Sequence, residues 1–342
     1  MEAASIAGGV RSSLERSPLA RLPDRLLKYV LTTLAALILV LIVYFFIRLV
    51  GQAKPAFAAE GVIGFTFHND WNVSANRFGA LPLLVGTLIT SAIALLIGVP
   101  VAVASALYVT ELSPRRARTP LTVLIELLAA VPSVVYGLWG IFFLAPKLHG
   151  AEQAVAEGLS FIPFIGGGLV TIPNYFITGL VLAVMVLPIV SAISREVMAT
   201  VPQDHKEAAL GLGATRWEMI RIAVIPYCRS GIVGGSMLGL GRAIGETIAV
   251  TILIGDAPQL GHHLFGQGYS LAAVIANEFG EATGLHRSAL FAAGLVLFVL
   301  TLIVNVLARV FVLRAGRSKG QSRAGDAGGA GQDSVATAAA GA

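Results

Sequence analysis

The chain has 342 residues, of which 56% are hydrophobic and only 13% are charged, and it carries a net charge of +5. An ordinary soluble domain has about a quarter charged residues, so this composition excludes a soluble globular fold. It equally excludes a mostly disordered chain, which would be poor in apolar residues. The single cysteine, Cys228, excludes an internal disulfide and any site built from several cysteines. The composition therefore predicts a protein embedded in a membrane.

Apolar stretches of membrane-spanning length recur along the chain. A helix needs about 20 mainly apolar residues to cross a bilayer. Five uncharged stretches meet this requirement, and a sixth is interrupted by Arg229, Arg242 and Glu246. The six stretches cover residues 29–47, 78–110, 127–146, 171–194, 227–255 and 290–308. The sequence therefore predicts an all-α membrane protein with six transmembrane helices.

The remaining segments complete the domain organisation. We expect a basic segment at residues 1–28, a first helix at 29–50, a loop at 51–79, the main transmembrane domain at 80–314 and a disordered tail at 315–342. Ala56, Phe57 and Ala58 resemble a signal-peptide cleavage site. The apolar stretch before them is longer than the roughly 7 to 15 residues of the apolar region of a signal peptide, which favours an uncleaved anchor helix.

Basic residues predict the orientation in the membrane. Of the 24 Lys and Arg residues, 18 fall at the two termini and in the connections after the second and fourth helices. Because basic residues concentrate on the cytoplasmic side, both termini are expected in the cytoplasm of a bacterial cell with the chain in its inner membrane. The charge is explained by topology and by contact with lipid, and no nucleic-acid partner is expected. Phe65 and Trp71, in the outward loop 51–79, are candidate apolar anchors for a binding partner.

The segment at residues 200–226 is predicted to form two short helices. Thr200 with Gln203, and Thr215 with Glu218, each fit the spacing of a capping box, which marks a helix start. Glycines 211 and 213 between them predict a bend. The small pair Ala208 and Ala209, beside Glu207, would let another protein approach closely.

This segment resembles the EAA loop of ABC-importer permeases, which has the pattern E-A-A-x(3)-G-x(9)-I-x-L-P. The matching residues are Glu207, Ala208, Ala209, Gly213 and Pro226. Ala223 and Ile225 depart from the pattern, both by mild apolar exchanges. The resemblance implies a type I importer permease fold and an EAA loop, residues 200–226, that docks on a separate ATPase subunit.

A narrower resemblance covers most of residues 75–312. Residues 129–140 read AAVPSVVYGLWG and residues 239–247 read GLGRAIGET. Both stretches resemble the phosphate-specific (Pst) permeases, and the YGLWG run with the basic N-terminal region favours the PstC subunit over PstA. This resemblance implies inward phosphate transport with three kinds of partner: a PstA-like permease, PstB-like ATPases and a PstS-like periplasmic binding protein. It implies no cofactor.

The stretch at residues 227–255 is the candidate translocation path. Its small face of Gly231, Gly235 and Gly239, spaced every four residues, allows another helix to pack closely. Charges at membrane depth usually face an interior or an aqueous path. Arg242 and Glu246, followed by Thr247, could therefore attract and pass an anion. Alternatively, Arg242 and Glu246 form an ion bridge that only holds the helices together.

Other functions remain open at this stage. The EAA loop does not specify cargo, so a permease for molybdate or sulfate is an alternative, and an ion-gradient-driven secondary transporter is another. The latter would need no ATPase and therefore no EAA loop. An enzyme is disfavoured because no nucleophile and base pair or set of metal ligands falls at membrane depth, so we expect no catalytic residue and no metal site. Glu126 is expected to be a structural partner for a basic residue.

Overall fold

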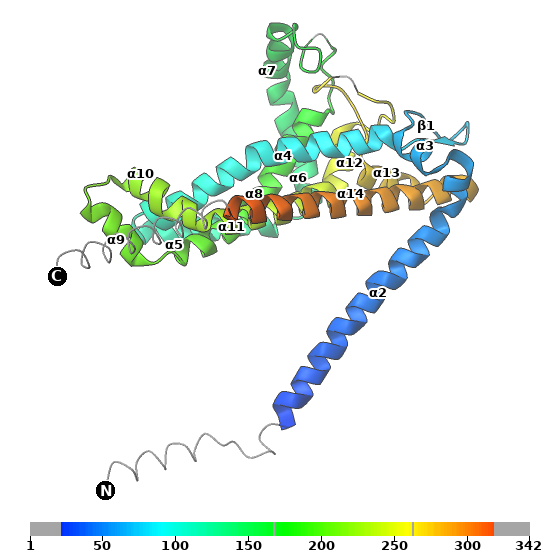
Figure 1. Ribbon diagram of the computed structural model, residues 1–342. Coiled ribbons are helices and arrows are strands. Elements are labelled where there is room, and N and C mark those ends of the chain that lie inside the picture. The colour runs from blue at the N-terminus through cyan, green and yellow to red at the C-terminus, as the bar shows by residue number, and fades with distance from the viewer. Residues whose placement is uncertain (1–21, 167, 262, 318–342) are drawn as a thin grey trace, which may run out of the picture. The chain divides into compact units, whose positions relative to one another are not determined.

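The computed structural model describes residues 22–166, 168–261 and 263–317 (Figure 1). The chain divides into two compact units, one ending at Gln52 and the other beginning at Ala53. Most of the predicted basic segment, residues 1–21, and most of the predicted tail, residues 318–342, lie outside the described residues.

Helix α2 (Leu22–Glu60) begins in the first unit and ends in the second. Its apolar stretch has the length and composition of a membrane span. The sequence predicted a loop that begins at residue 51. The helix instead includes residues 51–60 and ends at Glu60. The added residues include Ala53, Ala56, Ala58 and Ala59, and alanine is the strongest helix former, which explains the extension.

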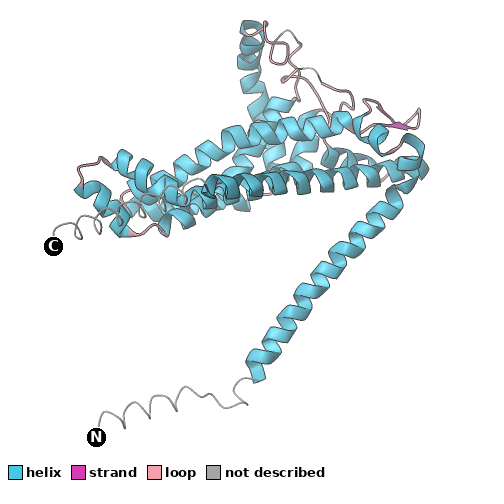
Figure 2. Cartoon of the chain, viewed as in Figure 1, coloured by secondary structure: helices cyan, strands magenta, loops and turns pink. Residues whose placement is uncertain are grey.

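In the described part of the second unit, helices and loops make up the structure apart from one pair of two-residue strands (Figure 2). Its first elements are α3 (Val62–Phe67), β1 (Trp71–Asn72), β2 (Arg77–Phe78), α4 (Leu81–Leu107), the π-helical segment η2 (Tyr108–Leu112), α5 (Arg115–Ala130), α6 (Ser133–Trp139), the π-helical η3 (Gly140–Leu144) and α7 (Ala145–Gly158). There follow α8 (Tyr175–Ala199), α9 (Gln203–Gly211), α10 (Arg216–Met219), the π-helical η4 (Ile220–Val224), α11 (Ile225–Gly245), α12 (Ile248–Ile254), α13 (Leu271–Glu278) and α14 (Gly284–Arg317). Strands β1 and β2 are antiparallel, with Trp71 opposite Phe78.

The described residues contain up to six candidate membrane spans, the number that the sequence predicted, if each of two bent pairs is counted as one span. Four of them, in α2, α4 with η2, α8 and α14, are single helices long and apolar enough to cross a bilayer. The other two are bent pairs: α5 meets the helix from α6 to α7 at 92°, and the helix from α10 to α11 meets α12 at 63°. The continuous helices predicted at residues 127–146 and 227–255 are therefore wrong in shape. Pro132 at the first bend has no N–H to continue the helix, which contributes to that break.

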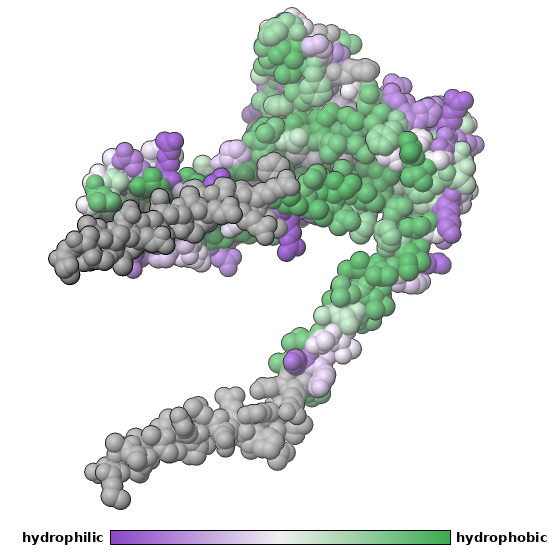
Figure 3. All heavy atoms as spheres, in the orientation of Figure 1, coloured by the Kyte–Doolittle hydropathy of each residue, from purple (hydrophilic) through white to green (hydrophobic). Residues whose placement is uncertain are grey.

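Helices α4, α8 and α11 form the centre of the second unit (Figure 1). Glycines let the first two approach closely. A Cβ on Gly98 of α4 would lie 3.0 Å from the backbone oxygen of Ala183, and a Cβ on Gly179 of α8 would lie 2.5 Å from the Ile93 side chain. Over this unit, apolar residues cover the helices, and polar residues gather at the end with α9 and α10 and around β1 (Figure 3).

Phe65 and Trp71 belong to the core of the second unit, which corrects their predicted role as exposed anchors. Phe65 is fully buried and Trp71 is 4% exposed. The Trp71 indole packs edge-on against Phe65 and Phe78 and donates a hydrogen bond of 3.1 Å from Nε1 to Oε2 of Glu278. Burial of these aromatic rings against each other is favourable. The residues next to them in the sequence, which form a polar loop, do not indicate this packing.

Candidate functional site

Helix α9 carries the first part of the EAA loop. Glu207 and Ala208 are exposed, whereas Ala209 is buried beneath them. Gly213 follows the helix with φ of +87°, a left-handed conformation that L side chains rarely adopt, and this explains why glycine is needed at the bend. The motif residues thus divide between an outward face, Glu207 with Ala208, and a turn.

The EAA loop has an apolar core of its own on the C-terminal ends of α4 and α8. Ala209 belongs to a buried cluster that also contains Ala106, Met198, Val201, Met219, Ile220, Val224 and Cys228. These residues come from α4, α8, α9, α10, η4 and α11. The loop is therefore packed onto the transmembrane helices and does not extend freely into solvent.

One of the two predicted capping boxes is present. Thr215 Oγ1 accepts a hydrogen bond from the backbone N–H of Glu218, and the Glu218 carboxylate accepts one from the backbone N–H of Thr215. This second bond holds the pKa of the exposed Glu218 carboxyl below its usual range. The box predicted at Thr200 is wrong, because the Thr200 hydroxyl donates back to the Val197 carbonyl and Pro202 caps α9 without a side-chain bond.

Large apolar side chains extend the exposed surface of the EAA loop, and the sequence analysis missed them. Leu210, Leu212 and Trp217 are 44%, 90% and 63% exposed. Single exposed apolar residues are ordinary on a protein surface, but several together mark an interaction site. Their signal in the sequence was the high apolar content of a predicted cytoplasmic hairpin. Pro226 lies away from this surface, at the start of α11 and directly after η4.

The predicted glycine face of α11 lies against α8. A Cβ on Gly231 would be 2.5 Å from the Val197 side chain, one on Gly235 would be 3.1 Å from Ile193, and one on Gly239 would be 2.5 Å from Val186. Larger residues at these positions would force the two helices apart. A second set, Gly234, Gly241 and Gly245, meets nothing within 4 Å, so another face of α11 is uncovered along with Leu238, which is 63% exposed.

Arg242 and Glu246 lie on either side of the end of α11. The helix ends at Gly245, so Glu246 occupies the bend rather than a continuous helical face. Arg242 Nη2 is 3.9 Å from Glu246 Oε2, with the Arg242 side chain 39% exposed and that of Glu246 only 9%. Glu246 Oε1 also accepts a weak hydrogen bond of 3.4 Å from the backbone N–H of Ala249 in α12. Thr247, the residue before α12, donates its hydroxyl to the Gly245 carbonyl.

The YGLWG run forms the contact between the two bent pairs. Gly137 in α6 lies against Ala249 and Ile252 of α12, and Gly140 in η3 lies against Leu253. Across the bend between α5 and α6, Tyr136 donates its hydroxyl to the Leu128 carbonyl of α5 at 2.7 Å. The residues that carry the Pst resemblance therefore join the two helix breaks to each other.

Glu126 has the structural role predicted for it. Its Oε1 is 3.2 Å from Nη2 of Arg195 on α8, and the Arg195 Nη1 also donates to Thr122. The pair connects α5 to the C-terminal end of α8. It does not involve the EAA loop.

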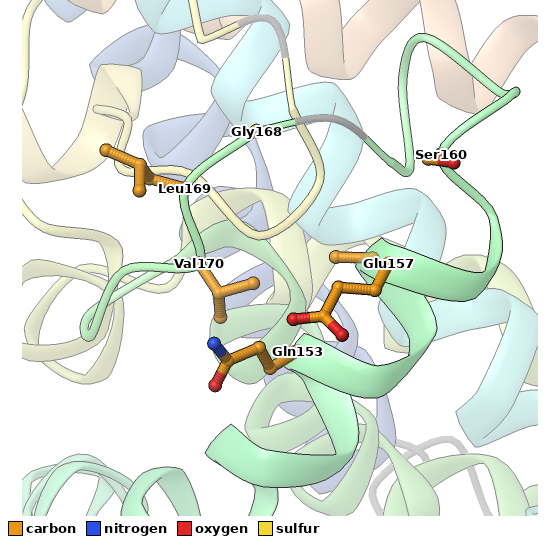
Figure 4. A pocket seen from close by; sticks show the side chains of 7 residues that line it. Gln153, Glu157, Ser160, Gly168, Leu169 and Val170 are labelled. Carbon is orange, nitrogen blue, oxygen red and sulfur yellow. The ribbon is translucent and has the colours of Figure 1, made fainter.

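A pocket of about 400 Å³ lies on the hairpin formed by α7 and the following loop (Figure 4). Gln153 and Glu157 of α7 face it from one side, and Leu169 and Val170 of the loop line the other. A Cβ on Gly168 would collide with the His263 ring, so this loop packs closely on the segment before α13. The pocket is a concave surface at the opposite end of α8 from the EAA loop.

Comparison with known proteins gives consistent matches over most of the chain. The family described as "Binding-protein-dependent transport system inner membrane component" matches residues 94–317. The chain is 41% identical to the phosphate transport system permease protein PstC of Xylella fastidiosa strain Temecula1, over 87% of this chain and 93% of that protein. It is 45% identical to PstC of Mesorhizobium japonicum, over 83% and 88% respectively. It is 42% identical to PstC 2 of Mycobacterium tuberculosis, over 85% and 92%.

Solved structures show the same fold at low sequence identity. A bacterial ABC transporter that imports alginate matches with a TM-score of 0.55 and 20% identity, over 85% of this chain and 99% of that one. A structure of a bacterial alginate ABC transporter in complex with its periplasmic protein gives a TM-score of 0.57 at 19% identity, over 87% and 99%. The resemblance in structure is thus to importer permeases.

Proposed function

Because this chain belongs to the inner membrane components of binding-protein-dependent transport systems and, within them, to the PstC permeases, we propose that it carries inorganic phosphate inward across the inner membrane. The observation that supports this cargo is the identity of 41% and 45% to PstC proteins over more than four fifths of the chain. These matches do not favour the alternative of a permease for molybdate or sulfate. The packed EAA loop also argues against a secondary transporter, which would have no use for it.

The proposed energy source is ATP hydrolysis by a separate PstB-like subunit that docks on the EAA loop. Glu207 and Ala208 supply a charge and a close-approach surface, and Leu212 and Trp217 supply apolar area. Tryptophan is enriched among the few residues that dominate the binding energy of protein interfaces. The chain itself would then be the transport subunit and would not hydrolyse ATP.

The uncovered face of α11 is the proposed contact with a PstA-like permease. Gly234, Gly241 and Gly245 leave space for another helix to approach, since nothing lies within 4 Å of a Cβ at any of them. Arg242, 39% exposed, belongs to the same surface. A path between the two permeases would therefore pass the Arg242 guanidinium, whose planar donors suit phosphate oxygens.

In this proposal Glu246 and Thr247 act at the bend rather than on the anion. The buried Glu246 carboxylate holds Arg242 and the start of α12. A carboxylate would repel phosphate, so its burial behind the guanidinium suits an anion path.

The PstS-like binding protein would meet the opposite end of the unit, where the α7 hairpin presents its concave pocket. Both chain termini would lie in the cytoplasm with the EAA loop.

Uptake into reconstituted vesicles tests the proposed cargo. The complete complex, with the binding protein on the outward side and ATP on the other, should accumulate labelled phosphate only when ATP can be hydrolysed. Labelled molybdate and sulfate serve as controls under the same conditions. Phosphate uptake without ATP would overturn the ATPase-driven mechanism, and preference for either rival anion would overturn the cargo.

A further inference from the structure

The strongest unassigned feature is a partly buried ion pair between the EAA loop and the end of α4. Lys206 on α9 places its Nζ 2.7 Å from Oε1 of Glu111 on η2. The side chains are 12% and 8% exposed, and the residues are 95 positions apart in the sequence. The pair is the shortest contact between unlike charges among the described residues.

Neighbouring residues of α9 therefore face in different directions. Glu207 is exposed, whereas Lys206, one residue earlier, points inward to Glu111. Successive positions on a helix differ by about 100°, so one short helix can contact a partner on one side and a transmembrane helix on the other. The Lys206 side chain therefore connects the outward-facing helix α9 directly to Glu111.

The segment that carries Glu111 is fixed to other helices as well. The Arg118 guanidinium of α5 donates to the Thr110 carbonyl at 2.6 Å, and the Thr110 hydroxyl lies 3.6 Å from Met198 Sδ of α8. Residues 108–112 are π-helical, and such turns are frequent at functional sites. The end of α4 is thus a junction at which α5, α8 and α9 meet.

The apolar cluster beneath the EAA loop cannot fix the position of α9 in the same way. Contacts among residues such as Ala209, Met219 and Val224 are non-directional, so the helix could shift along them at small cost. A partly buried ion pair is directional, and loss of one partner leaves the other charge without compensation where little water reaches it. The pair therefore sets where α9 lies relative to α4.

We propose that Lys206 and Glu111 form the rigid link that passes a displacement of α9 to α4 during transport. This inference rests on the proposed function, in which an ATPase moves the EAA loop. Lys206 and Glu111 are positioning residues: they contact neither the ATPase nor the cargo. Their removal should separate ATP hydrolysis from transport without releasing the ATPase.

The test compares Glu111→Gln, Lys206→Gln and the swap of Glu111→Lys with Lys206→Glu in the whole reconstituted complex. ATPase co-purification, ATP hydrolysis and phosphate uptake are measured together. Each single variant should retain its ATPase, and phosphate moved per ATP should fall by about tenfold, within the usual range for coupling between sites. The swap should recover most of that ratio, because the opposite charges still meet.

Glu126→Gln is the matched control, since it breaks an ion pair on the same side of the unit without touching α9. It should leave the ratio unchanged. Cys228, which is fully buried in the cluster below α9, reports on folding, because it reacts with a thiol reagent only if the packing opens. An unchanged ratio in both single variants would overturn the inference, as would loss of the ATPase from either one while Cys228 stays protected. If the unaltered complex moves no phosphate, the proposed function fails instead.

Discussion

Gly137 of α6 lies so close to α12 that a Cβ on it would be 3.2 Å from the Ala249 Cα. The same Cβ would be 2.9 Å from Cδ1 of Ile252. The flexible Ile252 side chain can shift, but the Ala249 backbone cannot do so without moving α12. This contact therefore sets how the two bent pairs meet.

We predict that Gly137→Val destabilises the protein by about 1–3 kcal/mol, the usual cost of overpacking a closely fitted interior. Gly150→Val in α7 is the control, because a Cβ at Gly150 meets nothing within 4 Å. Thermal unfolding of the purified protein in detergent measures both. Equal midpoints for the two variants would show that α6 and α12 are not closely packed.

Glu207 and Ala208 should be needed for the ATPase to bind. Glu207→Lys reverses the charge of the exposed face, and Ala208→Trp fills the space for close approach. We expect each to weaken ATPase co-purification by at least about tenfold, the effect of losing a central interface residue. Arg77→Glu reverses an exposed charge near β2 instead and should have no effect. Normal ATPase recovery with both EAA-loop variants would refute docking at this surface.

Cysteine labelling should place the loop at Asn72 outside the cell and the EAA loop inside. Asn72 is exposed in β1, and Leu212 is 90% exposed beyond α9. With Cys228 replaced by Ser, an impermeant thiol reagent added to intact cells should label Asn72→Cys at once and Leu212→Cys only after the membrane is opened. The reverse pattern would invert the predicted topology.

A charge swap separates the two interpretations of Arg242 and Glu246. Arg242→Glu with Glu246→Arg keeps two opposite charges at the bend but moves the cation from a partly exposed position, 39% exposed, to one that is 9% exposed. If Arg242 attracts the anion, the swapped protein should assemble while uptake falls by about 100-fold or more, as when a charge partner of phosphate is lost. Near-normal phosphate uptake would leave the ion pair with a structural role only.

Sequence patterns predicted the structure correctly where residues close together in the chain decide it. Six apolar stretches predicted six spans because a helix in lipid satisfies its own backbone hydrogen bonds, whatever it packs against. The capping box at Thr215 and Glu218 was correct for the same reason, since both partners lie within one turn. The matching box at Thr200 failed because α8 already used that hydroxyl to cap its own end.

Other features depended on residues that only the tertiary structure brings together. Phe65 and Trp71 were expected on the surface but are buried, because aromatic residues from distant segments meet around them. The bend at Glu246 was not predicted, since composition reports whether a segment is apolar but not whether it is straight.

The ion pair of Lys206 with Glu111 joins residues 95 positions apart, a separation at which no spacing rule applies. The sequence by itself thus determined the candidate spans through hydrophobicity, the Thr215 capping box through local hydrogen bonding, and the EAA loop through its resemblance to importer permeases. The folded chain decided which charges are paired and which helices pack together, because burial and close packing depend on residues far apart in the sequence.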